Sequence, residues 1–119
     1  MVLRFSDALL NQMASERFLD RVTHLLGEHY PAAKEALSTA KVREILRQQY
    51  NKAIKYGLRS ELDVARYIIT AWLLGIDFDT RFKAMNEFLT SPELTPTQKA
   101  EAIERTATTL LETLNGGRK

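Results

Sequence analysis

The sequence predicts an all-α fold: a single compact bundle of five or six helices around a central apolar helix at about residues 61–74. Three observations support this class. Apolar residues recur at helical spacing, whereas β-branched residues nowhere alternate over several positions. Helix start and stop signals divide the chain into segments, and one segment is apolar almost all round. A chain of 119 residues suits one domain, so we expect a single helical domain over residues 1–119.

The central helix has clear signals at both ends. Ser60 can cap its N-terminus, with Asp63 at the third helical position as a short variant of the capping box. Gly57 ends the preceding helix and Gly75 ends this one, since glycine adopts the left-handed conformation without a Cβ penalty. Because Val64–Leu74 is apolar on nearly every side, we expect neighbouring helices to seal this segment from solvent.

The first helical segment runs from about Ser6 to His29, and its apolar stripe is not continuous. Apolar residues of its first half lie on one side of a helix, and those of its second half lie on a largely different side. Ser15 stands at the changeover and can cap a new helix. We therefore expect a break, or a change of packing partner, near Ser15.

Proline and hydroxyl residues mark the next boundaries. Pro31 ends the first segment and begins a short turn that reaches Leu37. Ser38 or Thr39 then caps a helix that ends at Gly57.

After the central helix, residues 77–80 form a short polar joint and a helix follows at about residues 81–89. Ser91-Pro92 breaks that helix. Thr95-Pro96-Thr97-Gln98 is a strong start signal, with a capping threonine, proline at the first helical position and glutamine at the third. The last helix ends at Gly116-Gly117.

Composition excludes several classes of protein. The chain is 45% hydrophobic and 27% charged, which is typical of globular proteins. It has no cysteine, so it has neither disulfides nor thiolate chemistry, which fits a cytoplasmic location. The longest apolar run, Ile68–Ile76, is about half of what a membrane span needs. A net charge of +2 does not by itself imply a polyanionic partner.

No group of residues has the spacing of a metal or catalytic site. His24 and His29 are about 140° apart on a helix, whereas a shared zinc site needs spacings of three or four residues. Asp77 and Asp79 could serve as a catalytic acid and base. A capping role at the start of the following helix explains them better, because the first turn of a helix favours negative charge. We therefore expect no catalytic residue, no metal and no cofactor. A hydrolase with an unrecognised site near residues 77–79 is kept as an alternative.

One helix is asymmetric in charge. Residues 39–59 contain six basic residues and one acidic residue, a net charge of +5. Four of the basic residues fall within about 60° of one another, opposite the apolar face, and are the candidate partner-binding residues: Lys41, Lys52, Lys55 and Arg59. Such a face is usually the solvated side of an amphipathic helix. A nucleic-acid or anionic-ligand binder that uses this face is the second alternative, although nucleic acid is not the expected partner.

Four capping and packing motifs of this chain are similar to those of a known family. They are Glu28-His29-Tyr30-Pro31, Tyr56-Gly57-Leu58, Ser60-Glu61-Leu62-Asp63-Val64-Ala65-Arg66-Tyr67-Ile68 and Leu74-Gly75-Ile76-Asp77-Phe78-Asp79. The chain resembles, from about Phe18 to Leu94, the small all-helical proteins found beside effectors and spike proteins of bacterial type VI secretion systems. The resemblance implies a helical fold more strongly than a mechanism, and it implies an accessory role with a toxic effector.

The leading hypothesis is therefore a non-enzymatic protein-binding module accessory to a secreted effector, as an adaptor, a chaperone or an immunity protein. Its expected partner is an effector or a spike protein. The sequence leaves open which of these roles applies, and it leaves self-association open.

Overall fold

The computed structural model describes the backbone of residues 7–116 and the side chains of residues 16–113, and its regular elements are all helical. The all-α class is confirmed. Seven α-helices and one 3-10 turn occur in this part of the chain, instead of five or six helices, because two of the seven are short helices of four residues. None of the helices within residues 7–116 is long and apolar enough to cross a bilayer.

The chain forms two compact units, which divide between Arg47 and Gln48. The expectation of a single domain stays a prediction. The first unit contains α1 (Asp7–His29), η1 (Pro31–Ala33), α2 (Lys34–Leu37) and the start of α3 (Ala40–Lys55).

The expected break near Ser15 is wrong, because α1 is one continuous α-helix. Serine is only mildly unfavourable inside a helix, so its capping preference alone does not interrupt α1. The alternative, a change of packing partner near Ser15, involves side chains outside residues 16–113. The boundary at Tyr30-Pro31 is confirmed.

Glu16 links α1 to α3 within the first unit through ion pairs. Its carboxylate accepts hydrogen bonds from the guanidinium groups of Arg43 and Arg47, each at 2.8 Å. Arg43 also pairs with Asp20, and Arg47 with Glu44. These bonds from two arginines hold the pKa of the Glu16 carboxyl below its usual value.

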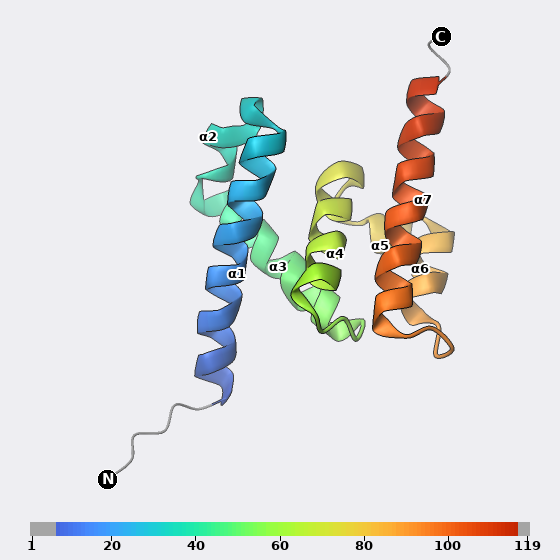
Figure 1. Ribbon diagram of the computed structural model, residues 1–119, viewed down its shortest axis with the longest axis horizontal. Helices are drawn as coiled ribbons and strands as arrows, with labels where there is room; N and C mark the ends of the chain where they lie inside the picture. The colour runs from blue at the N-terminus through green and yellow to red at the C-terminus, as the bar shows by residue number, and fades with distance from the viewer. Residues whose placement is uncertain (1–6, 117–119) are drawn as a thin grey trace. The chain divides into compact units, whose positions relative to one another are not determined.

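The second unit contains the rest of α3 followed by α4 (Glu61–Leu74), α5 (Phe78–Arg81), α6 (Lys83–Thr90) and α7 (Pro96–Gly116). Figure 1 shows α4 and α7 side by side and running in the same direction, and α6 also packs against α7. The buried aromatic rings of Tyr67 and Phe78 lie 4.9 Å apart in the core of this unit.

The side chains at the ends of the helices explain why the elements begin and end where they do. Ser60 Oγ accepts the backbone N–H of Asp63 at 3.1 Å, as expected for a cap. The carboxylate of Asp63 pairs with Arg66 at 3.1 Å and accepts a hydrogen bond from Thr97 at 2.8 Å. Gly75 has a φ of +113°, which confirms the left-handed stop signal.

The start signal of α7 is a complete capping box. Thr95 Oγ1 accepts the backbone N–H of Gln98 at 3.1 Å, and Gln98 Oε1 accepts the backbone N–H of Thr95 at 2.9 Å. At the start of α3, Thr39 Oγ1 accepts the backbone N–H of Val42 at 3.3 Å. Both sequence-based predictions of these caps are confirmed.

Val64–Leu74, which we expected to be sealed on nearly every side, contains no exposed residue, although its cover is uneven. One side is buried, through Val64, Tyr67, Ile68 and Ala71. The other side is covered only in part: Leu62 is 61% exposed, and Ala65, Ile69, Trp72 and Leu73 are half-buried. An apolar composition predicts that neighbouring helices pack against a helix, but it does not say which of its sides they bury.

Candidate functional site

The four basic residues expected to form one solvated face have different surroundings. Lys41 and Lys55 are exposed. Arg59 is exposed as well, and its guanidinium donates a hydrogen bond to the carbonyl oxygen of Ile54 at 3.4 Å. Lys52 is only one-third exposed, and its ammonium group binds the buried carboxylate of Asp79 at 2.8 Å.

Asp79 is the centre of a buried polar cluster in the second unit. Its side chain is 3% exposed; one oxygen accepts from Lys52, and the other accepts from the Tyr56 hydroxyl at 2.7 Å. Lys52 donates a further hydrogen bond to the carbonyl oxygen of Ile76 at 3.0 Å. The cluster therefore joins α3 to α5 and to the turn that follows α4.

The cluster shifts the pKa values of its members. Burial acts to raise the pKa of Asp79, but the hydrogen bonds from Lys52 and Tyr56 outweigh it, so the pKa lies below its usual value. Burial, and then the hydrogen bond to Asp79, raise the pKa of the Tyr56 phenol to about 12. Burial also raises the pKa of the Tyr67 phenol, whose hydroxyl has no hydrogen-bond partner within the described part of the chain.

Asp77 and Asp79 have separate environments. Asp77 is exposed and lies 4.0 Å from the Arg81 guanidinium, whereas Asp79 is buried against Lys52 and Tyr56. The expected capping role of these side chains is wrong for Asp77, because α5 has no side-chain cap. Asp79 acts as a buried ion-pair partner, which the sequence did not indicate because Lys52 is 27 residues away.

Both histidines lie on the surface. His24 contacts Glu28 one turn later at 3.0 Å, and both side chains are more than half exposed. Among residues whose side chains are described, no three metal-ligating groups of the histidine, cysteine or carboxylate type lie together.

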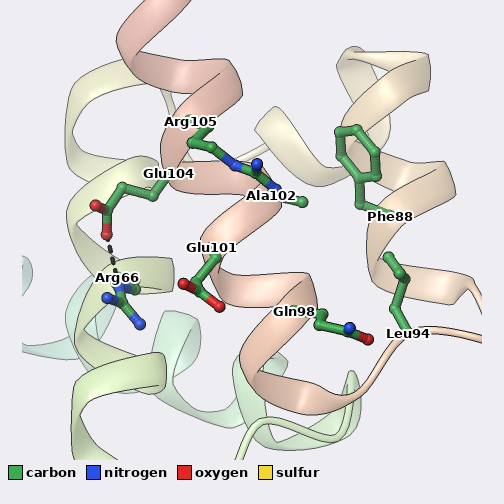
Figure 2. A pocket seen from close by; sticks show the side chains of 8 residues that line it. All are labelled: Arg66, Phe88, Leu94, Gln98, Glu101, Ala102, Glu104 and Arg105. Carbon is green, nitrogen blue, oxygen red and sulfur yellow. Dashed lines mark hydrogen bonds and ion pairs between the residues drawn. The ribbon is translucent and has the colours of Figure 1, made fainter.

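A groove on the second unit brings together side chains that the sequence reading did not connect. It has a volume of about 380 Å³ and lies where α7 meets α4 and α6. Figure 2 shows its lining residues: Arg66, Phe88, Leu94, Gln98, Glu101, Ala102, Glu104 and Arg105. A second hollow of about 320 Å³ shares Phe88, Ala102 and Arg105, so the groove continues along α7 to Thr109. We call this surface the α6–α7 groove.

The α6–α7 groove has an apolar wall and a charged floor. Phe88 and Leu94 are half-buried and form the wall on the α6 side. Arg105 extends from α7 over Ala102 toward Phe88, while Glu101 points to the opposite side, toward α4 (Figure 2). Charged and apolar side chains therefore line the same groove.

The two arginines of the groove differ in their partners. Arg66 binds Glu104 at 2.6 Å and Asp63 at 3.1 Å, so its guanidinium is already held in place. The Arg105 guanidinium makes no ion pair or hydrogen bond with any residue from 16 to 113. It is thus the cation of this groove that can bind an added carboxylate without first losing a partner.

Sequence reasoning missed this groove for a definable reason. Phe88 and Arg105 are 17 residues apart in the chain, and nothing in the sequence indicates that they line the same groove. The one available signal was the six-residue spacing between Phe88 and Leu94 across a proline break, which places two apolar side chains beside the start of α7. No family model matches the chain, and no curated protein or solved structure is significantly similar to it.

Proposed function

We propose that this chain is a non-enzymatic protein-binding module whose α6–α7 groove holds a segment of a partner protein. The observation that supports the proposal most is that the half-buried ring of Phe88 lines the same groove as Arg105, whose side chain extends toward it (Figure 2). An aromatic anchor next to an arginine is a common composition for the energetic centre of a protein interface.

The chemistry of the groove specifies the partner segment. An apolar side chain of the partner packs between Phe88 and Leu94, and a neighbouring aspartate or glutamate binds Arg105. Arginine and carboxylate can form two parallel hydrogen bonds, so this contact fixes orientation as well as charge. The groove is open and shallow, which suits an extended or helical segment better than a small molecule.

The expected partner is taken from the resemblance of residues 18–94 to small helical proteins found beside secretion-system effectors. In this proposal the partner is a secreted effector or a spike protein, and the module acts as an adaptor, a chaperone or an immunity protein. These three roles share one physical requirement, which is a stable surface that covers a segment of the partner.

The two alternatives have less support from the geometry. The anion-binding hypothesis relied in part on Lys52, whose ammonium group binds Asp79 and Ile76. The hydrolase hypothesis relied on Asp77 and Asp79 acting together, and the two carboxylates have different partners. Both alternatives stay predictions, and the following experiment separates the basic-face alternative from the proposal.

The test is affinity capture from the native host with the full chain and two variants. Phe88→Asp disrupts the apolar wall of the groove, and Lys55→Glu reverses an exposed charge on the basic face. We expect the wild-type chain and Lys55→Glu to recover the same effector or spike protein, and Phe88→Asp to recover at least tenfold less of it.

Circular dichroism and thermal melting establish that both variants keep the fold before capture. Loss of the partner with Lys55→Glu but not with Phe88→Asp would transfer the binding function to the basic face. Equal recovery by all three proteins would reject the groove.

A further inference from the structure

Two of the charged side chains that line the α6–α7 groove are available to a partner. Four charged side chains line it, and two of them, Arg66 and Glu104, bind each other at 2.6 Å. The other two are Glu101 and Arg105, and both are exposed. Neither of them makes an ion pair or a hydrogen bond with any residue from 16 to 113. The groove therefore presents one carboxylate and one guanidinium for binding.

Glu101 and Arg105 are about one turn apart on α7 and extend to different sides of it. Glu101 extends toward α4, whereas Arg105 extends over Ala102 toward Phe88 on α6 (Figure 2). Glutamate and arginine four residues apart on a helix can pair with each other, but exposed pairs of this kind are weak. A partner can therefore bind both side chains without having to break a strong contact between them.

The surroundings of Glu101 add to its negative charge. Arg66 pairs with two carboxylates, that of Glu104 at 2.6 Å and that of Asp63 at 3.1 Å, so its single positive charge is already outweighed. Glu101 lines the same groove as Arg66 and contributes a further negative charge. A local excess of negative charge attracts a basic side chain. The side of the groove toward α4 is therefore suited to a lysine or an arginine of a partner.

The side of the groove toward α6 has the opposite character. Phe88 and Leu94 form its apolar wall, and Arg105 is the charged lining residue that extends toward this wall (Figure 2). A partner that covers the wall also removes water from around Arg105, and an ion pair becomes stronger where water is excluded. This side is therefore suited to an apolar side chain with an aspartate or a glutamate next to it.

We propose that the partner segment is bipolar, with an acidic residue on Arg105, a basic residue on Glu101 and an apolar residue against Phe88 and Leu94. This inference rests on the proposed function, because it concerns the same groove. Four residues of α7 span about 6 Å, so the acid and the base are about two residues apart in an extended segment and three or four apart in a helix. Exchanging the acid and the base would bring like charges together at both positions. The order of the charges therefore fixes the direction in which the segment lies along α7.

The first test selects ligands for the full chain from a display library of random short peptides. The wild-type chain should enrich peptides that combine an apolar residue, an acid and a base. Arg105→Glu should replace the acid by a base in the enriched peptides, and Glu101→Arg should replace the base by an acid. The control is Glu112→Arg, at an exposed glutamate of the same helix outside the groove, which should enrich the wild-type pattern.

The second test compares one enriched peptide with a counterpart in which the acid and the base have changed places. Fluorescence anisotropy should show that the wild-type chain binds the exchanged peptide at least tenfold more weakly, because like charges then meet at both positions. The double variant Glu101→Arg/Arg105→Glu should bind the exchanged peptide at least tenfold more tightly than the original peptide. Both substituted side chains are exposed, so this variant reverses the charges without disturbing the core of the unit.

The outcomes separate this inference from the proposed function. If the wild-type chain enriches apolar and acidic peptides without a base, and Phe88→Asp loses them, the groove binds a segment but the bipolar pattern is rejected. An unchanged peptide preference of the double variant would reject the pattern as well. If no enriched peptide depends on Phe88, the groove is not a binding site for a segment, and the proposed function is rejected together with this inference.

Discussion

The ammonium group of Lys52 donates a 2.8 Å hydrogen bond to the carboxylate of Asp79, and this bond joins two elements that lie 27 residues apart in the chain. Asp79 is buried and Lys52 is one-third exposed, so the pair is desolvated on one side only. The Tyr56 hydroxyl satisfies the second carboxylate oxygen at 2.7 Å. We conclude that this cluster stabilises the second unit by linking α3 to α5.

Asp79→Asn should lower the free energy of unfolding by about 2 kcal/mol, because the substitution leaves the Lys52 ammonium without its anion. The value is lower than for a fully buried pair since Lys52 keeps part of its hydration. Urea denaturation followed by circular dichroism measures the change. Asp77→Asn, at an exposed carboxylate nearby, should change it by less than about 0.5 kcal/mol. Equal effects of the two substitutions would mean that the ion pair does not stabilise the unit.

Stability should fall on acidification because of the same carboxylate. The pKa of Asp79 in the folded chain is below the ordinary value of 3.8, so the folded state binds fewer protons than the unfolded state as the pH falls through this region. The contribution is fully present above the unfolded pKa and is lost as the pH falls through the folded one. The measurement is the urea midpoint between pH 6 and pH 2.5.

Lys52→Met is the control for this pH dependence. It removes the hydrogen bond that lowers the pKa of Asp79, so the acid-dependent loss of stability below about pH 4 should become smaller. Curves of identical slope for the wild type and Lys52→Met would show that other carboxylates, such as Glu16, account for the whole effect.

Gly75→Ala should destabilise the chain by about 2 kcal/mol. Gly75 has a φ of +113°, and an added Cβ would lie 3.2 Å from an oxygen of Asp77. Gly27→Ala is the control, because Gly27 lies inside α1 without a positive φ, and its added Cβ would lie 3.2 Å from Lys34 Cγ and 3.9 Å from Leu37 Cδ1. Alanine is the better helix former, so this control should leave the melting temperature unchanged or slightly higher. A larger loss at Gly27 than at Gly75 would contradict the argument.

Thr95→Ala should cost about 1 kcal/mol, since the backbone N–H of Gln98 loses its side-chain acceptor at the start of α7. Thr109→Ala, on the exposed surface of the same helix, removes a threonine without touching a cap and should be neutral or slightly stabilising. Thermal unfolding of the two variants side by side checks the difference. A neutral Thr95→Ala would show that water caps this helix equally well.

Local signals predicted the ends of the helices because capping depends on residues within one turn. Ser60, Thr95 and Gly75 each have the role that their residue type indicates. Ser15 has the same residue type as Ser60 but lies within a continuous helix. The difference is one of context, because the carboxylate of its neighbour Glu16 binds two arginines of α3 and fixes this turn of α1 in place.

Long-range contacts could not be predicted from the sequence. Lys52 has the periodicity of a solvated residue and Asp79 the position of a cap, and only the folding of α5 against α3 brings them together. The α6–α7 groove is similar, since Phe88 and Arg105 belong to helices separated by a proline-containing loop. The partly covered side of α4 also depends on where its neighbours lie, which an apolar composition does not specify.

The most direct test of the binding function is a nuclear magnetic resonance titration of arginine side chains with the partner recovered by capture. The Nε–Hε signals of Arg105, in the groove, and of Arg59, on the basic face, can be assigned with Arg105→Lys and Arg59→Lys. We predict that the Arg105 signal shifts and saturates with the partner while the Arg59 signal stays in place. A saturating shift of Arg59 with an unchanged Arg105 would contradict the account.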